Sequence, residues 1–138
     1  MASTKIESNR VIINKSAEFV FNFMNDFNHI IQLLPQDKIS DWQSDENQCS
    51  FKIQNAAVIP LVKKDSTPHS QINIISGDKT PFPFTLVVTF NTIDDNTTEA
   101  FLNFEGEINA FLKMMVVKPL TNLFNYMANK LKEVCEQN

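Results

Sequence analysis

Residues 109–135 read NAFLKMMVVKPLTNLFNYMANKLKEVC, and this stretch predicts a long amphipathic helix. Asn109 is placed to cap a helix that begins at Ala110, and Pro119 is expected to bend or restart it. Beyond the proline, apolar residues recur at helical spacing. This stripe consists of Leu120, Phe124, Met127, Leu131 and Val134, and it is widened by Leu123 and Cys135. A helix of this kind needs a large apolar surface to lie on.

The middle of the chain is predicted to form a sheet that supplies this apolar surface. Its apolar residues alternate with polar ones, as they do in strands with one buried face. Residues 84–91 and 99–108 each have one apolar and one polar face, and residues 49–55 alternate in the same way. Shorter strands are expected at 40–43, 58–64 and 70–76. Since polar turn sequences separate these segments, they predict an antiparallel meander.

The N-terminal third predicts one strand followed by two short helices. Residues 4–14 indicate the strand, and its inward side is ambiguous because Ile12 and Ile13 are adjacent. Ser16 is placed to cap an amphipathic helix, and Pro35 ends a second short helix. The expected order is therefore strand, two short helices, about six strands and a long helix, without internal repeats or a linker.

This order of elements resembles the START-like superfamily, also called SRPBCC, over nearly the whole chain. The resemblance is carried by the sequence VIINKSAEFVFNF at residues 11–23 and by residues 112–131, which contain a methionine pair and Lys118-Pro119-Leu120. It implies a single START-like domain over residues 1–138, of the α+β class. The implied helix-grip fold wraps a curved antiparallel sheet of six to seven strands around the C-terminal helix, with two short helices after the first strand.

The resemblance also implies a place for a ligand, because proteins of this superfamily commonly hold a hydrophobic molecule between the sheet and the long helix. The composition favours the same place, since twelve Phe residues and flexible methionines are available to line it. We expect the ligand-binding residues to be Phe51, Ile53, Asn55, Ile72, Ile74, Phe84, Leu86, Val88, Phe90, Leu102, Phe104, Met114, Met115, Leu123 and Met127. Candidate polar groups are Asn55, Ser70 and Tyr126. The apolar residues can equally be core packing, and Asn55 a turn residue, in which case no pocket remains.

Composition and charge narrow the possible partners. The hydrophobic fraction of 43% and the charged fraction of 20% are typical of a globular domain. Twelve basic against sixteen acidic residues give a net charge of −4, which argues against a nucleic-acid partner. The longest apolar stretch, 56–62, is too short for membrane insertion, and without a signal peptide we expect a cytoplasmic location. Cys49 and Cys135 are expected to be free thiols.

The sequence groups no nucleophile, base and orienting residue, and no ligand spacing accompanies His29 or His69. We therefore expect no catalytic residue, no metal and no cofactor. We also expect the protein to be a monomer. Three functions stay open. The first is non-enzymatic binding or carriage of a small hydrophobic or amphipathic ligand, lipid-like or aromatic. The second is a cyclase- or hydrolase-type enzyme, which needs a buried acid or base, and the third is an interaction module with a filled core.

Overall fold

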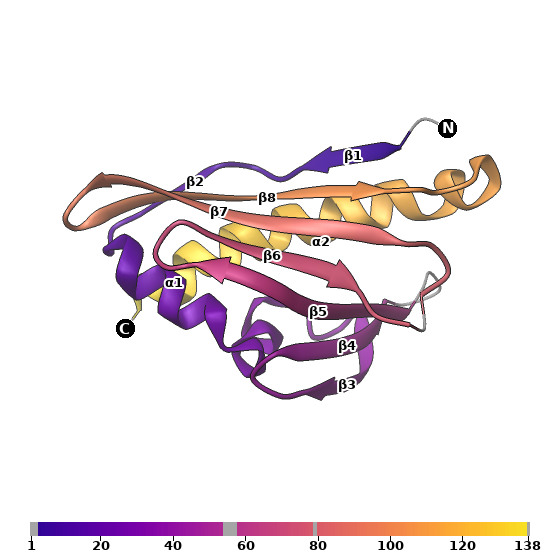
Figure 1. The fold of residues 1–138 in the computed structure, drawn as a ribbon, viewed down its shortest axis with the longest axis horizontal. Helices are drawn as coiled ribbons and strands as arrows, with labels where there is room; N and C mark the ends of the chain where they lie inside the picture. The colour runs from indigo at the N-terminus through magenta and orange to yellow at the C-terminus, as the bar shows by residue number, and fades with distance from the viewer. Residues whose placement is uncertain (1–2, 54–57, 79, 138) are drawn as a thin grey trace.

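The computed structural model describes residues 3–53, 58–78 and 80–137. One antiparallel sheet, two short helices near the N-terminus and a long C-terminal helix form the fold (Figure 1). The strands are β1 (Thr4–Glu7), β2 (Val11–Ile13), β3 (Ile39–Ser44), β4 (Gln48–Ile53), β5 (Val58–Thr67), β6 (Gln71–Ser76), β7 (Phe84–Asp94) and β8 (Thr97–Gly106). The helices are α1 (Ala17–Asn25), the 3-10 helix η1 (Phe27–Leu33) and α2 (Ala110–Glu136).

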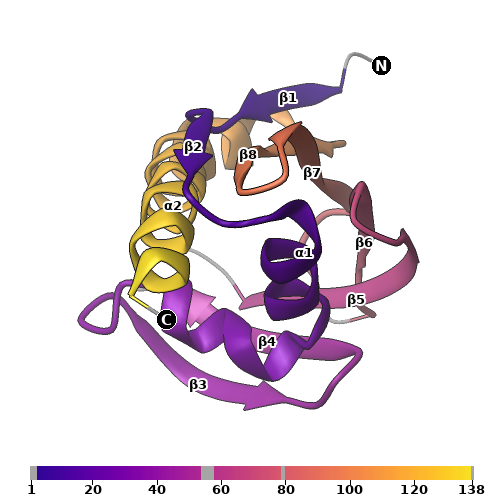
Figure 2. The same ribbon diagram turned by 90° about the vertical axis from the view of Figure 1, so that its left-hand side faces the viewer.

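The strands are ordered β1-β8-β7-β6-β5-β4-β3, and β2 also pairs with β8. Every pairing is antiparallel. Figure 2 shows the strands following an arc whose open side is closed by α2. The predicted helix-grip architecture is confirmed, although the described residues form eight strands where six to seven were expected.

The extra strand arises because the predicted first strand, residues 4–14, is broken into β1 and β2. At the break, Ser8 is buried, and its N–H donates to the Leu102 carbonyl of β8 over 2.9 Å. Its Oγ accepts a hydrogen bond from the Leu102 N–H over 2.8 Å, so a side chain replaces one rung of the backbone ladder. Beyond the break Ile13 is buried and Ile12 is exposed, which resolves the ambiguity of the sequence.

The two short helices begin at capping side chains. Ser16 Oγ accepts a hydrogen bond from the Phe19 N–H over 3.1 Å, as the sequence predicts for the start of α1. Asp26 ends α1 and caps η1, because its Oδ1 accepts from the Asn28 N–H over 3.0 Å. The second short helix is therefore a 3-10 helix, which carries the chain from α1 toward Pro35 and β3.

Helix α2 begins where the sequence predicts, since Asn109 Oδ1 accepts a hydrogen bond from the Leu112 N–H over 2.9 Å. The helix continues through Pro119 without restarting, so of the two expected effects of this proline, a bend or a restart, the restart does not occur. The predicted apolar stripe is confirmed as the buried face of the helix. Its buried residues are Val116, Leu120, Leu123, Phe124, Met127, Ala128, Leu131, Val134 and Cys135.

Candidate functional site

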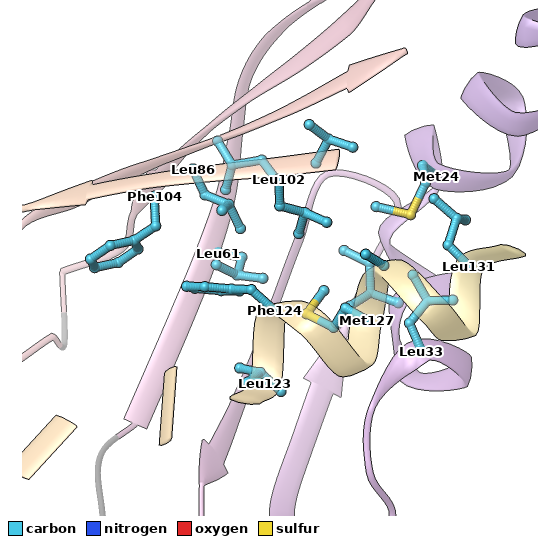
Figure 3. Close-up of a cluster of buried hydrophobic side chains, with 14 of the residues drawn as sticks. Met24, Leu33, Leu61, Leu86, Leu102, Phe104, Leu123, Phe124, Met127 and Leu131 are labelled. Atoms are coloured by element: carbon cyan, nitrogen blue, oxygen red, sulfur yellow. The ribbon is translucent and has the colours of Figure 1, made fainter. Parts of the chain in front are cut away.

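The space between the sheet and α2 is filled by side chains. Figure 3 shows Phe104 and Leu102 of β8 facing Phe124 and Met127 of α2. The Phe104 ring lies 5.3 Å from that of Phe84 and 5.4 Å from that of Phe124, measured between centroids. Such separations are those of rings in direct contact.

Twelve of the predicted ligand-binding residues lie in this packed interior. They are Phe51, Ile53, Ile72, Ile74, Phe84, Leu86, Val88, Phe90, Leu102, Phe104, Leu123 and Met127. None of them is more than 8% exposed. A side chain beside a water-sized void keeps accessible surface, and these side chains keep almost none. The structure thus brings the predicted residues together as a packed core, and a role for them in ligand binding stays a prediction.

Two of the predicted residues, Met114 and Met115, do not lie in that interior. Met114 is 88% exposed and Met115 is 49% exposed, so neither lies between the sheet and α2, where the predicted site was expected. The physical reason is that the first turns of α2 extend past the end of β8 (Figure 1). Asn55 lies outside the described residues. Of the other polar candidates, Ser70 is exposed and Tyr126 is 39% exposed.

A groove of about 470 Å³ lies at the edge of the interior, where α2 passes the β3–β4 side of the sheet. It is lined by Pro35, Lys38, Ile39, Ile53, Lys118, Pro119, Asn122, Leu123 and Tyr126. Two of these, Ile53 and Leu123, belong to the predicted site. The remaining lining residues come from the segment that leads into β3 and from α2. Among these remaining residues, only Tyr126 was a candidate from the sequence.

The groove combines an apolar floor with a basic rim. Ile53 and Leu123 are buried, and Ile39 is half-buried beside them. Lys38 and Lys118 are exposed, and within the described part of the chain neither side chain has an ion-pair or hydrogen-bond partner. No carboxylate is among the lining residues. This arrangement favours a molecule with an apolar body and an anionic or polar end.

Two larger hollows, each of about 690 Å³, flank the β3–β4 turn. Asp45 and Gln48 line both of them, and neither includes a residue of α2. The pKa of Asp45 is lowered, because its carboxylate accepts hydrogen bonds from the Asn47 N–H and the Gln48 side chain. That shift is explained by the turn itself, so these hollows give no indication of a binding site.

The ionisable side chains of residues 3–53, 58–78 and 80–137 lie at or near the surface, apart from the two cysteines. No Asp, Glu or His in these ranges is buried. No group of three or more metal-ligating side chains occurs among them either. The large pKa shifts are those of Cys49 and Cys135. Burial raises the pKa of each thiol from 9.0 to about 12. Both cysteines are free, as predicted. Within the same ranges, no helix is long and apolar enough to span a membrane.

Comparison with known proteins gives likeness of structure only. No family model and no curated protein matches the sequence. A START superfamily protein from Mycobacterium smegmatis superposes with a TM-score of 0.70 at 14% identity, covering 96% of this chain and 97% of that one. The Zhui aromatase/cyclase from Streptomyces sp. R1128 superposes with a TM-score of 0.73 at 13% identity, covering 99% and 95%.

Norcoclaurine synthase from Thalictrum flavum, in complex with dopamine and hydroxybenzaldehyde, superposes with a TM-score of 0.72 at 10% identity. The superposition covers 99% of this chain and 88% of the synthase. At such identities the shared feature is the arrangement of sheet and helices, not the chemistry of a site. Together with the strand order and the position of α2, these likenesses show that the chain has the helix-grip fold of START-like proteins.

Proposed function

We propose that the protein binds a small amphipathic molecule in the groove between α2 and the β3–β4 side of the sheet. The observation that carries this proposal is the pair Lys38 and Lys118, which have no partner among the described residues, at the rim of an apolar groove of about 470 Å³. The apolar part of the ligand lies against Ile39, Ile53 and Leu123, and its anionic end lies between the two ammonium groups. The helix-grip fold supports binding of this kind, since structures with the same fold hold small molecules.

The groove has the volume and the chemistry for a short acyl chain or one aromatic ring system carrying a carboxylate or phosphate. Burying about 200 Å² of apolar ligand surface contributes roughly 5 kcal/mol. The loss of translational and rotational freedom on association offsets much of that gain. A dissociation constant in the micromolar to millimolar range is therefore expected for a simple amphiphile.

The packed interior favours a ligand site in the groove over one between the sheet and α2. Because the side chains between β8 and α2 leave almost no accessible surface, an apolar molecule cannot enter there without displacing them. Leu123 is the residue at which groove and interior meet, since its side chain belongs to both. A larger ligand would enter the interior by displacing Leu123 first.

The proposal is tested by adding dodecanoate or dodecanol to isotopically labelled protein and following the amide resonances. Dodecanoate is expected to shift resonances of Ile53, Leu123 and Tyr126, and to bind more tightly than the uncharged alcohol. Lys38→Gln and Lys118→Gln should each reduce that preference, whereas Lys64→Gln, an exposed lysine outside the groove, should not. Absence of any shift at millimolar dodecanoate, or shifts confined to other surfaces, would overturn the proposal.

A further inference from the structure

The first turns of α2 present apolar side chains to solvent. Phe111 is 73% exposed, Met114 is 88% exposed and Met115 is 49% exposed. Their spacing of i, i+3 and i+4 places them on one face of the helix, here called the helix-tip patch. The tip lies beyond the end of β8, so no strand covers it (Figure 1). A contiguous group of exposed apolar side chains indicates an interaction surface, whereas single exposed apolar residues are common and need no explanation.

The first half of α2 carries lysines and no carboxylate, although the chain as a whole is acidic and the exposed Glu105 and Glu107 precede the helix. Residues 108–132 contain four lysines and no Asp or Glu, in a chain of net charge −4. Lys130 and Lys132 form ion pairs with carboxylates of the last helical turns. Lys113 and Lys118 are exposed and have no ion-pair partner among the described residues. Lys118 lies three residues after Met115 and four after Met114, so its positive charge borders the patch, and Lys113 adds a second positive charge on the same turns of the helix.

We propose that the helix-tip patch docks the protein peripherally on an anionic lipid surface. Phe111 and Met114 enter the boundary between headgroups and acyl chains, and Lys113 and Lys118 pair with lipid phosphates and carboxylates. Apolar side chains beside basic ones on a helix are the features that bind such an interface. This inference does not depend on ligand binding in the groove.

The shape and charge of the patch favour a lipid surface over two other occupants. A peptide that docks onto this chain needs a groove to receive it, and none of the three hollows described above is lined by a residue of the helix-tip patch. A second copy docking through the same patch would bring Lys113 and Lys118 of both chains together, and like charges facing one another oppose association. A fluid lipid surface requires no such complementarity and supplies the negative charge.

The experiment is co-sedimentation of the full chain with phosphatidylcholine vesicles, with and without about one-third phosphatidylserine. Binding is expected only to the anionic vesicles, and it should weaken as salt is raised, because ions screen the lysines. Lys113→Gln and Lys118→Gln should each reduce partitioning about fivefold. Phe111→Ser with Met114→Ser should reduce it at least about tenfold, since that change removes the inserted apolar surface.

Two matched control residues lie away from the helix-tip patch, one near the β7–β8 turn and one on β5. Ile93, 53% exposed near the β7–β8 turn, is changed to Ser as the apolar control, and the exposed Lys64 is changed to Gln as the charge control. Neither control should alter partitioning. Circular dichroism and thermal unfolding of each variant show that the fold is retained.

Three results would overturn the inference. The first is a wild-type chain that does not sediment with anionic vesicles at low salt. The second is a Phe111→Ser/Met114→Ser variant that binds them as well as wild type. The third is sedimentation equilibrium showing a dimer that the same double variant abolishes, because a second copy would then be the occupant of the patch.

Discussion

Replacing Phe104 by Ala tests whether the interior of this fold is packed or holds a cavity for a ligand. The Phe104 side chain is 3% exposed, and its ring contacts those of Phe84, Phe124 and Phe82 at centroid separations of 5.3, 5.4 and 6.4 Å. Truncating a packed Phe costs about 3–5 kcal/mol. Losing three aromatic contacts, each worth about 0.5–1.5 kcal/mol, places the expected loss near the upper end of that range.

The assay is urea unfolding followed by the fluorescence of Trp42, whose ring stacks on Phe51 of β4 at a centroid separation of 6.2 Å. An ordinary domain has about 5–15 kcal/mol of stability, so Phe104→Ala should unfold at much lower urea, with an unchanged slope. The matched control is Phe111→Ala, which removes a 73% exposed ring and should cost no more than about 0.5 kcal/mol. A loss below about 1.5 kcal/mol for Phe104→Ala would refute the packed interior, because a side chain that lines an open cavity gives up fewer contacts.

Three further predictions use the same urea titration. Gly106→Ala should destabilise by about 1–3 kcal/mol, because an added Cβ would lie 2.9 Å from Phe104 Cζ; an unchanged midpoint would show that the ring moves freely. Ser8→Ala should lower the free energy of unfolding by about 1–3 kcal/mol, since it removes the hydroxyl that accepts a hydrogen bond from a buried N–H of β8. Ser8→Thr, which keeps the hydroxyl, should lower it less. The buried thiols of Cys49 and Cys135 have pKa values of about 12 in the folded state against 9.0 for the free group. Unfolding then releases protons above about pH 9, so the free energy of unfolding should fall by about 1.4 kcal/mol per thiol at about pH 10. Replacing both cysteines by Ala should abolish that part of the pH dependence.

The sheet and the long helix could be predicted because each has one buried and one solvated face over many residues. In β7, residues 84–90 alternate strictly between more and less buried positions, as the sequence does. Asn109 predicts the first turn of α2 correctly, because an Asn side chain before an apolar helical stripe caps it locally. These features depend on neighbours in sequence, and therefore they can be read from it.

The break between β1 and β2 could not be predicted, because its cause is a long-range hydrogen bond. Ser8 accepts from an amide of β8 that is 94 residues away in the chain. Nothing near Ser8 in the sequence distinguishes it from a polar residue on the exposed face of a strand. Interruptions that a side chain satisfies from a distance depend on tertiary structure.

The groove was predicted only in part, for a similar reason. Ile53 and Leu123 were expected because they are apolar and in phase with buried positions. Lys38 and Lys118 are 80 positions apart in the sequence, and they share one rim only because η1 turns the chain back beneath α2. The absence of any carboxylate from residues 108–132 is a sequence signal that could have indicated an anion-binding helix.

The exposed methionines show that an apolar residue in a predicted amphipathic helix is not always buried. Met114 is nine residues before Leu123, which places it on the opposite face of the helix. Met115 is eight residues before Leu123, so its exposure does not follow from the periodicity. Their exposure also depends on how far α2 projects beyond β8, and that length is a property of the folded domain.

Ligand binding in the groove and lipid docking at the helix tip place different demands on three lysines. Lys38 lines the groove and is not on α2, Lys113 lies in the helix-tip segment and does not line the groove, and Lys118 lines the groove and follows the helix-tip patch on α2. Lys38→Gln should therefore weaken dodecanoate binding and leave vesicle partitioning unchanged, and Lys113→Gln should do the reverse. Only Lys118→Gln should weaken both. If all three substitutions weakened both processes equally, a general loss of positive charge would explain the results, and neither site would be needed.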